Sequence, residues 1–199
     1  RTAITANPTQ PSATGNGLTW VVVNSLVYYT ASSSRKRITV FRAMGSSPSS
    51  GAVTFDEAGQ TQTNATWTIE EFSGMDTSGT NGSGAIVQST SNKDETVTTS
   101  VLTVTLAAFS STDNATFGVF ANDVNTGLDA VGSGFIKLGD SQTGTGESVV
   151  SEYKGTNDTS VDIDWTNNAV LGGIAIEIKA ATAAGGANVS WRNLLGVGQ

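Results

Sequence analysis

Apolar and polar side chains alternate most regularly in residues 65–72, ATWTIEEF. A period of two is the spacing of a β-strand with one buried face, and we expect Trp67 and Ile69 to lie on that face. The following residues, 73–84, are rich in Gly, Asp, Ser and Asn, which favour turns. Most of the chain repeats this arrangement of a strand followed by a Gly, Ser or Thr connection.

The longest apolar stretch, residues 18–29, has the sequence LTWVVVNSLVYY. Its β-branched and aromatic content favours a strand over a helix, and its apolar density predicts a central strand covered on both faces. Residues 37–43 are expected to return beside it. Residues 96–106 alternate with a slip near Ser100, which indicates a β-bulge. Further strands are predicted at residues 52–55, 85–88, 115–121, 133–138, 148–154, 160–165 and 171–179.

No part of the chain shows a sustained helical period, and its Thr, Val and Gly content disfavours helix. About ten short strands separated by turn residues indicate an all-β fold, an antiparallel β-sandwich of the jelly-roll or concanavalin-like type. We assign this sandwich to residues 18–181. Residues 1–17 hold two of the three prolines and are expected to form an extended N-terminal arm, while residues 182–199 form a C-terminal arm.

The length of 199 residues fits a single domain. Charged residues make up 14% of the chain, well below the roughly 25% of average proteins, and 23 Ser and 29 Thr predict a surface rich in hydroxyl groups. The formal net charge of -7 argues against binding to nucleic acid, because phosphate binding needs clustered Lys and Arg. No apolar run approaches the roughly 18 residues of a membrane-spanning helix, so no membrane partner is expected.

The local concentration of positive charge consists of Arg35, Lys36, Arg37 and Arg42. The simpler interpretation is a solvated hairpin end. The alternative is a contact of this cluster with an acidic neighbouring subunit, which charge complementarity would favour.

Cysteine and histidine are both absent from the chain. Disulfides, thiol catalysis, an imidazole base, a Ser-His-Asp triad and zinc sites built on Cys or His are therefore excluded. Glycoside hydrolysis needs two carboxylates across one cleft. Glu70 and Glu71 point to opposite faces of a strand, and Asp162 and Asp164, which share a face, lie outside any E-x-D-x-E motif typical of sugar-cleaving concanavalin-like sandwiches. We interpret these carboxylates as solvated and expect no enzymatic activity.

Calcium is the one cofactor that the residues bring into question. Asp123, Asn125 and Asp129 supply oxygen ligands at alternating positions, as hard-cation loops do. Gly127 stands where a further ligand is needed, however, and no Glu follows at the distance of an EF-hand. An Asx-rich turn is the better interpretation, and no cofactor is predicted.

Four segments of the chain carry a family resemblance: GLTWVVVNSLVYY, RITVFRAMGSSPSSGAVTF, ATWTIEEFSGMDTSGTNGSGAIVQS and GGIAIEIKAA. Together they resemble a family of small β-sandwich proteins encoded by tailed bacteriophages and prophages. The similarity covers residues 18–181 and is most specific from Trp67 through the turn at residues 72–79. Members of the family are regarded as virion structural or tail-associated proteins with a lectin-like jelly roll, so the resemblance implies a particle component and not a catalyst.

This resemblance leads us to expect a non-enzymatic virion protein, a capsid decoration, head fibre or tail-associated subunit, that binds other copies of itself and other virion proteins. An arm lying across an adjacent copy can convert an exposed strand edge into an interface. The apolar C-terminal residues need burial either in their own sandwich or in a neighbour's. The candidate subunit contacts are Ile4, Pro8, Pro11, Arg35, Arg37, Trp191, Leu194 and Leu195.

The alternative hypothesis is a carbohydrate-binding, lectin-like module of a phage tail or a secreted adhesin, because sugar rings stack on exposed Trp or Tyr. Trp20, Tyr28, Tyr29 and Tyr153 are the candidates for such stacking, although core packing is the commoner role of these rings. A third hypothesis is a domain appended to a cell-surface enzyme.

Overall fold

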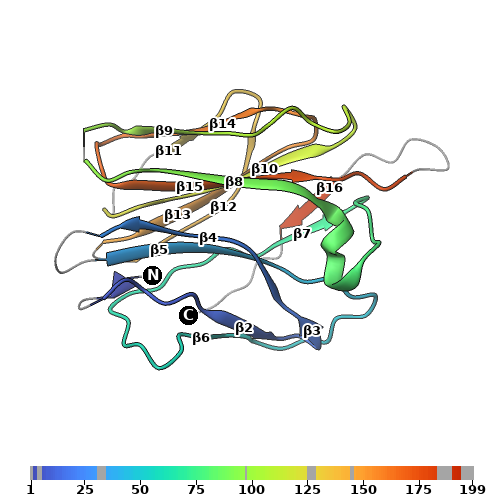
Figure 1. Cartoon of the computed structure of the whole chain (residues 1–199), viewed down its shortest axis with the longest axis horizontal. Coiled ribbons are helices and arrows are strands. Elements are labelled where there is room, and N and C mark those ends of the chain that lie inside the picture. Colours follow the sequence, from blue (N-terminus) through green and yellow to red (C-terminus); the bar gives the residue numbers. More distant parts are fainter. Residues whose placement is uncertain are drawn as a thin grey trace.

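The computed structural model describes residues 2–3, 6–30, 35–96, 98–124, 129–143, 146–182 and 190–193. These residues form an all-β protein of antiparallel strands with one short 3-10 helix, η1 (Thr80–Ala85). Figure 1 shows the sheets stacked as successive layers. This confirms the predicted all-β, antiparallel class.

A five-stranded sheet forms the middle layer. Its strands lie in the order β12 (Ile136–Gln142), β13 (Ser148–Lys154), β10 (Ala115–Asn122), β15 (Leu171–Ile178) and β8 (Ile86–Asp94). Every residue of β10 and β15 is buried, because both faces of the sheet are covered. Two adjacent glycines let aromatic rings approach β15 from both sides: a Cβ on Gly172 would lie 2.5 Å from the Cβ of Tyr28, and one on Gly173 would lie 2.6 Å from Cδ1 of Phe120.

One face of this sheet, which we call the closed face, is covered by β11 (Asp129–Val131), β14 (Ser160–Trp165) and β9 (Val101–Thr105). In β14, Val161 and Ile163 are fully buried and Trp165 is 3% exposed. These side chains pack against Phe120 and Leu171 of the middle sheet. The predicted alternation of residues 160–165 is therefore confirmed.

The other face, which we call the open face, is covered by two smaller sheets. One contains β1 (Thr2–Ala3), β5 (Arg35–Arg42) and β4 (Val21–Tyr29), and the other contains β7 (Glu70–Ser73) and β16 (Ser190–Asn193). A third sheet of β3 (Leu18–Thr19), β2 (Ser12–Gly15) and β6 (Val53–Asp56) lies beyond them, at the bottom of Figure 1. Part of the expected N-terminal arm is thus the middle strand of that sheet.

The expectation of one central strand over residues 18–29 is wrong. Trp20 separates β3 from β4, and these two strands belong to different sheets. β4 lies at the edge of its sheet, and most of its side chains are only half-buried.

The predicted buried face of residues 65–72 is also wrong. Residues 65–68 alternate, but Trp67 is 50% exposed, whereas Thr66 and Thr68 are half-buried. Ile69, the other residue of the predicted buried face, is half-buried, as Glu70 is. Thr66 Oγ1 donates a hydrogen bond to Ser141 Oγ at 2.6 Å, so the polar side of the segment faces the middle sheet. The ladder between β7 and β16 covers only Glu70–Ser73 of this segment.

Candidate functional site

A cavity of about 930 Å³ lies against the open face. Its walls come from β4 and β5, from residues 65–72 and from side chains of the middle sheet, including Phe117, Val119 and Ile176. Protein interiors have few voids larger than a water molecule, whereas ligand pockets measure roughly 300–1,000 Å³. This cavity is therefore the candidate functional site.

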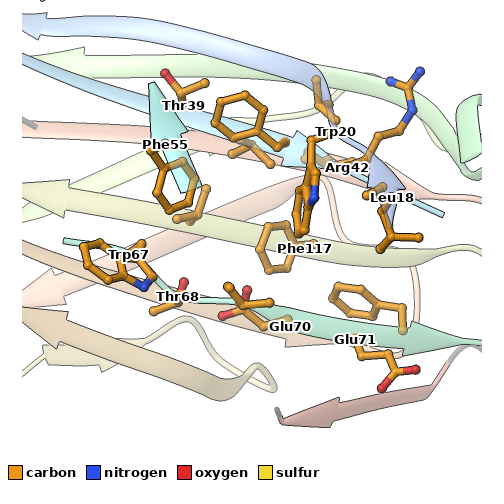
Figure 2. A pocket seen from close by; sticks show the side chains of 18 of the residues that line it. Leu18, Trp20, Thr39, Arg42, Phe55, Trp67, Thr68, Glu70, Glu71 and Phe117 are labelled. Atoms are coloured by element: carbon orange, nitrogen blue, oxygen red, sulfur yellow. The ribbon is translucent and has the colours of Figure 1, made fainter. Parts of the chain in front are cut away.

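Aromatic side chains line the cavity, with Phe55 and Trp67 next to each other and Phe117 and Trp20 farther along it (Figure 2). The rings of Phe41 and Phe55 lie 6.1 Å apart, and those of Phe55 and Trp67 lie 5.9 Å apart, which are ordinary distances for favourable aromatic pairs. Trp20 also lines the cavity, and its Nε1 donates a hydrogen bond to the carbonyl of Gly15 at 3.1 Å. The site can therefore stack on or enclose an apolar or ring-shaped group.

One carboxylate faces the middle sheet beside the cavity. Ser151 Oγ donates a hydrogen bond to Glu70 Oε1. Burial raises the pKa of Glu70, and hydrogen bonds from Ser151 and Thr68 oppose that rise. Glu71 leaves β7 on the other side and is exposed (Figure 2). These two carboxyl groups do not flank a common substrate position, as glycoside hydrolysis would require.

The cluster of positive charge is used inside the chain, which corrects its interpretation as a solvated hairpin end. Lys36 Nζ forms an ion pair with Glu147 Oε1 at 2.6 Å, and both side chains are 3% exposed. Arg37 Nε donates to the carbonyl of Pro8 at 2.5 Å, and Arg42 Nε donates to the carbonyl of Asn81 at 3.2 Å. These contacts tie β5 to the loop at Pro8, to η1 and to the residue that precedes β13.

The candidate subunit contacts lie partly within the described residues and partly outside them. Pro8 and Pro11 are buried within their own chain, and Arg35 Nη1 donates to Asn7 Oδ1 at 3.4 Å. Trp191 lies in β16, opposite Phe72 of β7. Ile4, Leu194 and Leu195 lie outside the described residues.

Two of the four rings considered for glycan stacking are core residues. Tyr28 is 1% exposed and its hydroxyl donates to the carbonyl of Asn122 at 3.2 Å, and Tyr153 is 3% exposed. Tyr29 is half-buried against the same core, and Trp20 lines the cavity. Trp67, whose side chain is 50% exposed, was placed on a buried face by sequence reasoning. Alternation identifies two faces of a strand but not which one meets solvent.

The residues considered for calcium have other contacts. Asp123 Oδ1 accepts a hydrogen bond from the backbone N–H of Val170 at 2.9 Å, and Asp129 forms an ion pair with Lys137 at 3.3 Å. Asn125 and Gly127 lie outside the described residues. Among the residues that the structure describes, no cluster of three or more acidic side chains is arranged to hold a metal ion.

A second unusual carboxyl group, Glu152, lies on the closed face and is fully buried. Its Oε2 accepts a hydrogen bond from the N–H of Gly132 at 3.0 Å, while Oε1 has no hydrogen-bond partner. Burial, with a contribution from the charges of Asp162 and Asp158, raises the pKa of Glu152 to about 8. The protonated form of this side chain therefore predominates at pH 7 in the folded state.

No protein-family model, curated protein or solved structure gives a significant match to the chain. No helix of the described residues has the length and apolar character needed to cross a membrane.

Proposed function

We propose that the protein is a non-enzymatic structural subunit of a bacteriophage particle, a capsid decoration, head fibre or tail-associated protein, that assembles through the edges of its sheets. The family resemblance of residues 18–181 supports a particle component. The internal use of the charged groups around the cavity, described above, agrees with a role in which the molecule supplies surface and shape.

We further propose that residues 86–178 form a jelly roll. Counted along the chain from β8 to β15, the middle sheet contains the first, eighth, third and sixth strands side by side, and the closed face is covered by the second, seventh and fourth. Such an order arises when two Greek keys are wound together, and it is frequent in viral capsid and lectin domains. The fifth strand, β12, departs from the pattern because it pairs with the sixth at the edge of the middle sheet.

The observation that carries the assembly proposal is the position of exposed apolar side chains. Four large apolar residues are exposed in the described part of the chain, and three of them lie on edge strands: Val87 on β8, Val101 on β9 and Ile136 on β12. Ile136 is 51% exposed. Strands at a sheet edge offer unpaired backbone groups to another chain, and apolar edge residues strengthen such pairing.

The test is the oligomeric state of the full chain, measured by light scattering as the protein concentration is raised. We expect the mass to exceed that of a monomer and Ile136→Lys to lower it. Thr14→Lys, an exposed change on the middle strand β2, is the control and should have no effect. A monomer at every concentration, or absence of the protein from purified particles, would overturn the proposal.

A second candidate function, glycan binding, is supported by the half-exposed ring of Trp67 next to Phe55. Sugar rings stack on such surfaces. A glycan array probed with the full chain is the test, with Trp67→Ala expected to abolish any hit and Trp67→Phe to retain part of it. An array without hits, or hits that persist in Trp67→Ala, would remove this candidate.

A further inference from the structure

We propose that the cavity on the open face binds a small organic cation, an aromatic primary amine, whose ammonium group meets the carboxylate of Glu70 and whose ring lies among the aromatic side chains of the wall. This inference goes beyond the proposed function, because neither subunit assembly nor glycan stacking assigns a ligand to the interior of the cavity.

Glu70 supplies the negative charge. Its side chain is half-buried on β7 and lines the cavity. Ser151 Oγ donates a hydrogen bond to Oε1, and the Thr68 hydroxyl also bonds to the carboxyl group. No cationic side chain that the structure describes forms an ion pair with Glu70. Charges removed from water are usually paired, so a ligand that brings an ammonium group gains a charge-assisted hydrogen bond that a neutral ligand lacks.

The space beside this carboxyl group is large and mostly apolar. It measures about 930 Å³, and the middle sheet contributes Phe117, Val119 and Ile176 to its wall. A single metal or ammonium ion would leave most of this volume empty. Pockets for small organic ligands measure roughly 300–1,000 Å³, so the cation that fits here carries an apolar body.

Aromatic side chains project into the cavity opposite Glu70. In Figure 2, Trp20 and Phe55 point toward the side of the cavity on which Glu70 lies. The rings of Phe55 and Trp67 lie 5.9 Å apart. The face of such a ring carries partial negative charge, and it attracts an ammonium group within roughly 6 Å of its centroid. The same rings can stack on an aromatic ligand, so they favour both parts of an aromatic amine.

Three other carboxyl groups line the cavity, those of Glu57, Glu71 and Glu147. Glu147 forms its ion pair with Lys36. Glu71 is exposed on the other side of β7 (Figure 2). Glu57 follows β6 and is half-buried. Glu70 therefore sets the charge that a ligand meets on the side of the middle sheet.

The two arginines that line the cavity are bound within the chain. Arg37 Nε donates to the carbonyl of Pro8 at 2.5 Å, and Arg42 Nε donates to the carbonyl of Asn81 at 3.2 Å. Figure 2 shows the guanidinium group of Arg42 directed away from Glu70. Because neither group accompanies Glu70, that carboxylate would repel an anionic ligand and attract a cationic one.

Three ligands that share an indole ring test the charge preference, by isothermal titration calorimetry with the full chain near neutral pH. Tryptamine is cationic, tryptophol is neutral and indolepropionate is anionic. Tryptamine should bind at least about tenfold more tightly than tryptophol, which is the difference between a charge-assisted and a neutral hydrogen bond, and indolepropionate should bind most weakly. Equal affinities for tryptamine and tryptophol, tighter binding of indolepropionate, or binding of none of the three would overturn the inference.

Glu70→Gln tests the carboxyl group itself. The amide oxygen can still accept the hydrogen bond from Ser151, but the charge is lost, so the preference for tryptamine over tryptophol should disappear. The matched control, Glu71→Gln, removes the neighbouring exposed carboxylate and should keep the preference. Near-UV circular dichroism shows whether both variants fold. A preference retained in Glu70→Gln would contradict the inference; if that variant does not fold, the three ligands on the unsubstituted protein still decide the question.

The indole N–H signals of the protein in NMR spectra locate the bound amine. Tryptamine should shift the signals of Trp20 and Trp67, which line the cavity, and leave that of Trp165, which is buried on the closed face, unchanged. If saturating tryptamine shifts neither Trp20 nor Trp67, or shifts Trp165 alone, the amine binds elsewhere and the inference is wrong.

Discussion

The two faces of the middle sheet are packed differently, although both strands at its centre are buried along their whole length. On the closed face, Val104, Val161 and Ile163 are 0% exposed. On the open face, Val23 and Val40 are only half-buried, and about 930 Å³ of space remains. The sheet supplies apolar surface on both sides, so the difference must originate in the strands that cover it.

Those covering strands differ in how they make contact. β14 alternates strictly and presents apolar side chains to the sheet. β4 and β5 carry polar residues within their spans, and these reach neighbouring elements through directed bonds: Asn24 Nδ2 donates to Ser89 Oγ at 2.9 Å, and Lys36 forms an ion pair with Glu147. Directed bonds set the spacing of two layers, but only close-packed side chains exclude the remaining space.

Truncation of a phenylalanine on each side of β10 should show most strongly that the closed face is packed more tightly than the open face. Phe120 is 0% exposed on the closed face, and Phe117 lines the cavity on the open face. Phe120→Ala should lower the free energy of unfolding by about 4–5 kcal/mol, within the usual range for buried Phe. Phe117→Ala should cost about 1 kcal/mol less, because a ring that already borders a cavity has fewer contacts to lose. Urea denaturation measures both; equal losses would mean that the open face is filled.

Breaking the buried ion pair between Lys36 and Glu147 should lower the free energy of unfolding through contacts of the open face. Lys36→Met takes away the ammonium group beside the buried carboxylate of Glu147. Breaking such a pair typically costs about 3–5 kcal/mol, because a charge is left in a poorly solvated place. The double variant Lys36→Met, Glu147→Leu should recover most of the loss. If Lys36→Met unfolds at the same urea concentration as the unsubstituted protein, the pair contributes little and the layers are held together by other contacts.

Sequence pattern predicts two strands best, β14 on the closed face and β13 in the middle sheet. The alternation of residues 160–165 and the apolar density of residues 148–154 predict β14 and β13 with the bounds that the structure has. β14 alternates between buried and solvated side chains, and β13 is buried on both sides. Each pattern can be recognised within a few consecutive residues. Nothing distant is needed to recognise them.

The open face depends on distant contacts, and there the pattern misleads. Thr66 hydrogen-bonds to Ser141, 75 residues further along, and Glu70 to Ser151. These partners turn the polar side of the segment inward and leave Trp67 half-exposed. The cavity itself could not be predicted, because it results from how closely two layers approach and not from any motif. The sequence shows that basic residues cluster on the strand that became β5. It does not show that their side chains bond to partners within the same chain.

On the closed face, Glu152 should make the free energy of unfolding depend on pH. Burial raises the pKa of Glu152 to about 8, above its value in the unfolded chain. The folded state therefore holds a proton that the unfolded state releases, so this stabilisation is complete below the unfolded pKa and is lost as the pH rises to about 8. Each unit of pKa difference corresponds to about 1.4 kcal/mol, which predicts a loss of a few kcal/mol relative to Glu152→Gln between pH 5 and pH 9.

Urea denaturation of both proteins at several pH values measures this loss. Glu71→Gln removes a carboxylate from an exposed position of β7 and serves as the control. Its profile should run parallel to that of the unsubstituted protein. If the free energy of unfolding of Glu152→Gln also changes with pH in parallel with that of the unsubstituted protein, the prediction is wrong. The carboxyl group of Glu152 must then reach solvent or a partner when it ionises.

Removal of a single hydrogen-bonding side chain, Ser151 or Thr116, should give the smallest difference in the free energy of unfolding. Ser151 and Thr116 are both fully buried, but Ser151 donates to Glu70 beside the cavity, whereas Thr116 Oγ1 donates to the carbonyl of Thr156 at 2.9 Å and accepts from the N–H of Asp158. Ser151→Ala should cost about 1 kcal/mol, because Glu70 is only half-buried, and Thr116→Val about 2 kcal/mol, because two backbone groups lose their partner. Loss of the Ser151 bond, which favours the charged form, should also raise the pKa of Glu70 further. A carboxyl-carbon NMR titration that shows no such rise would mean that another donor replaces Ser151, and the open face would then be more adaptable than its bonds imply.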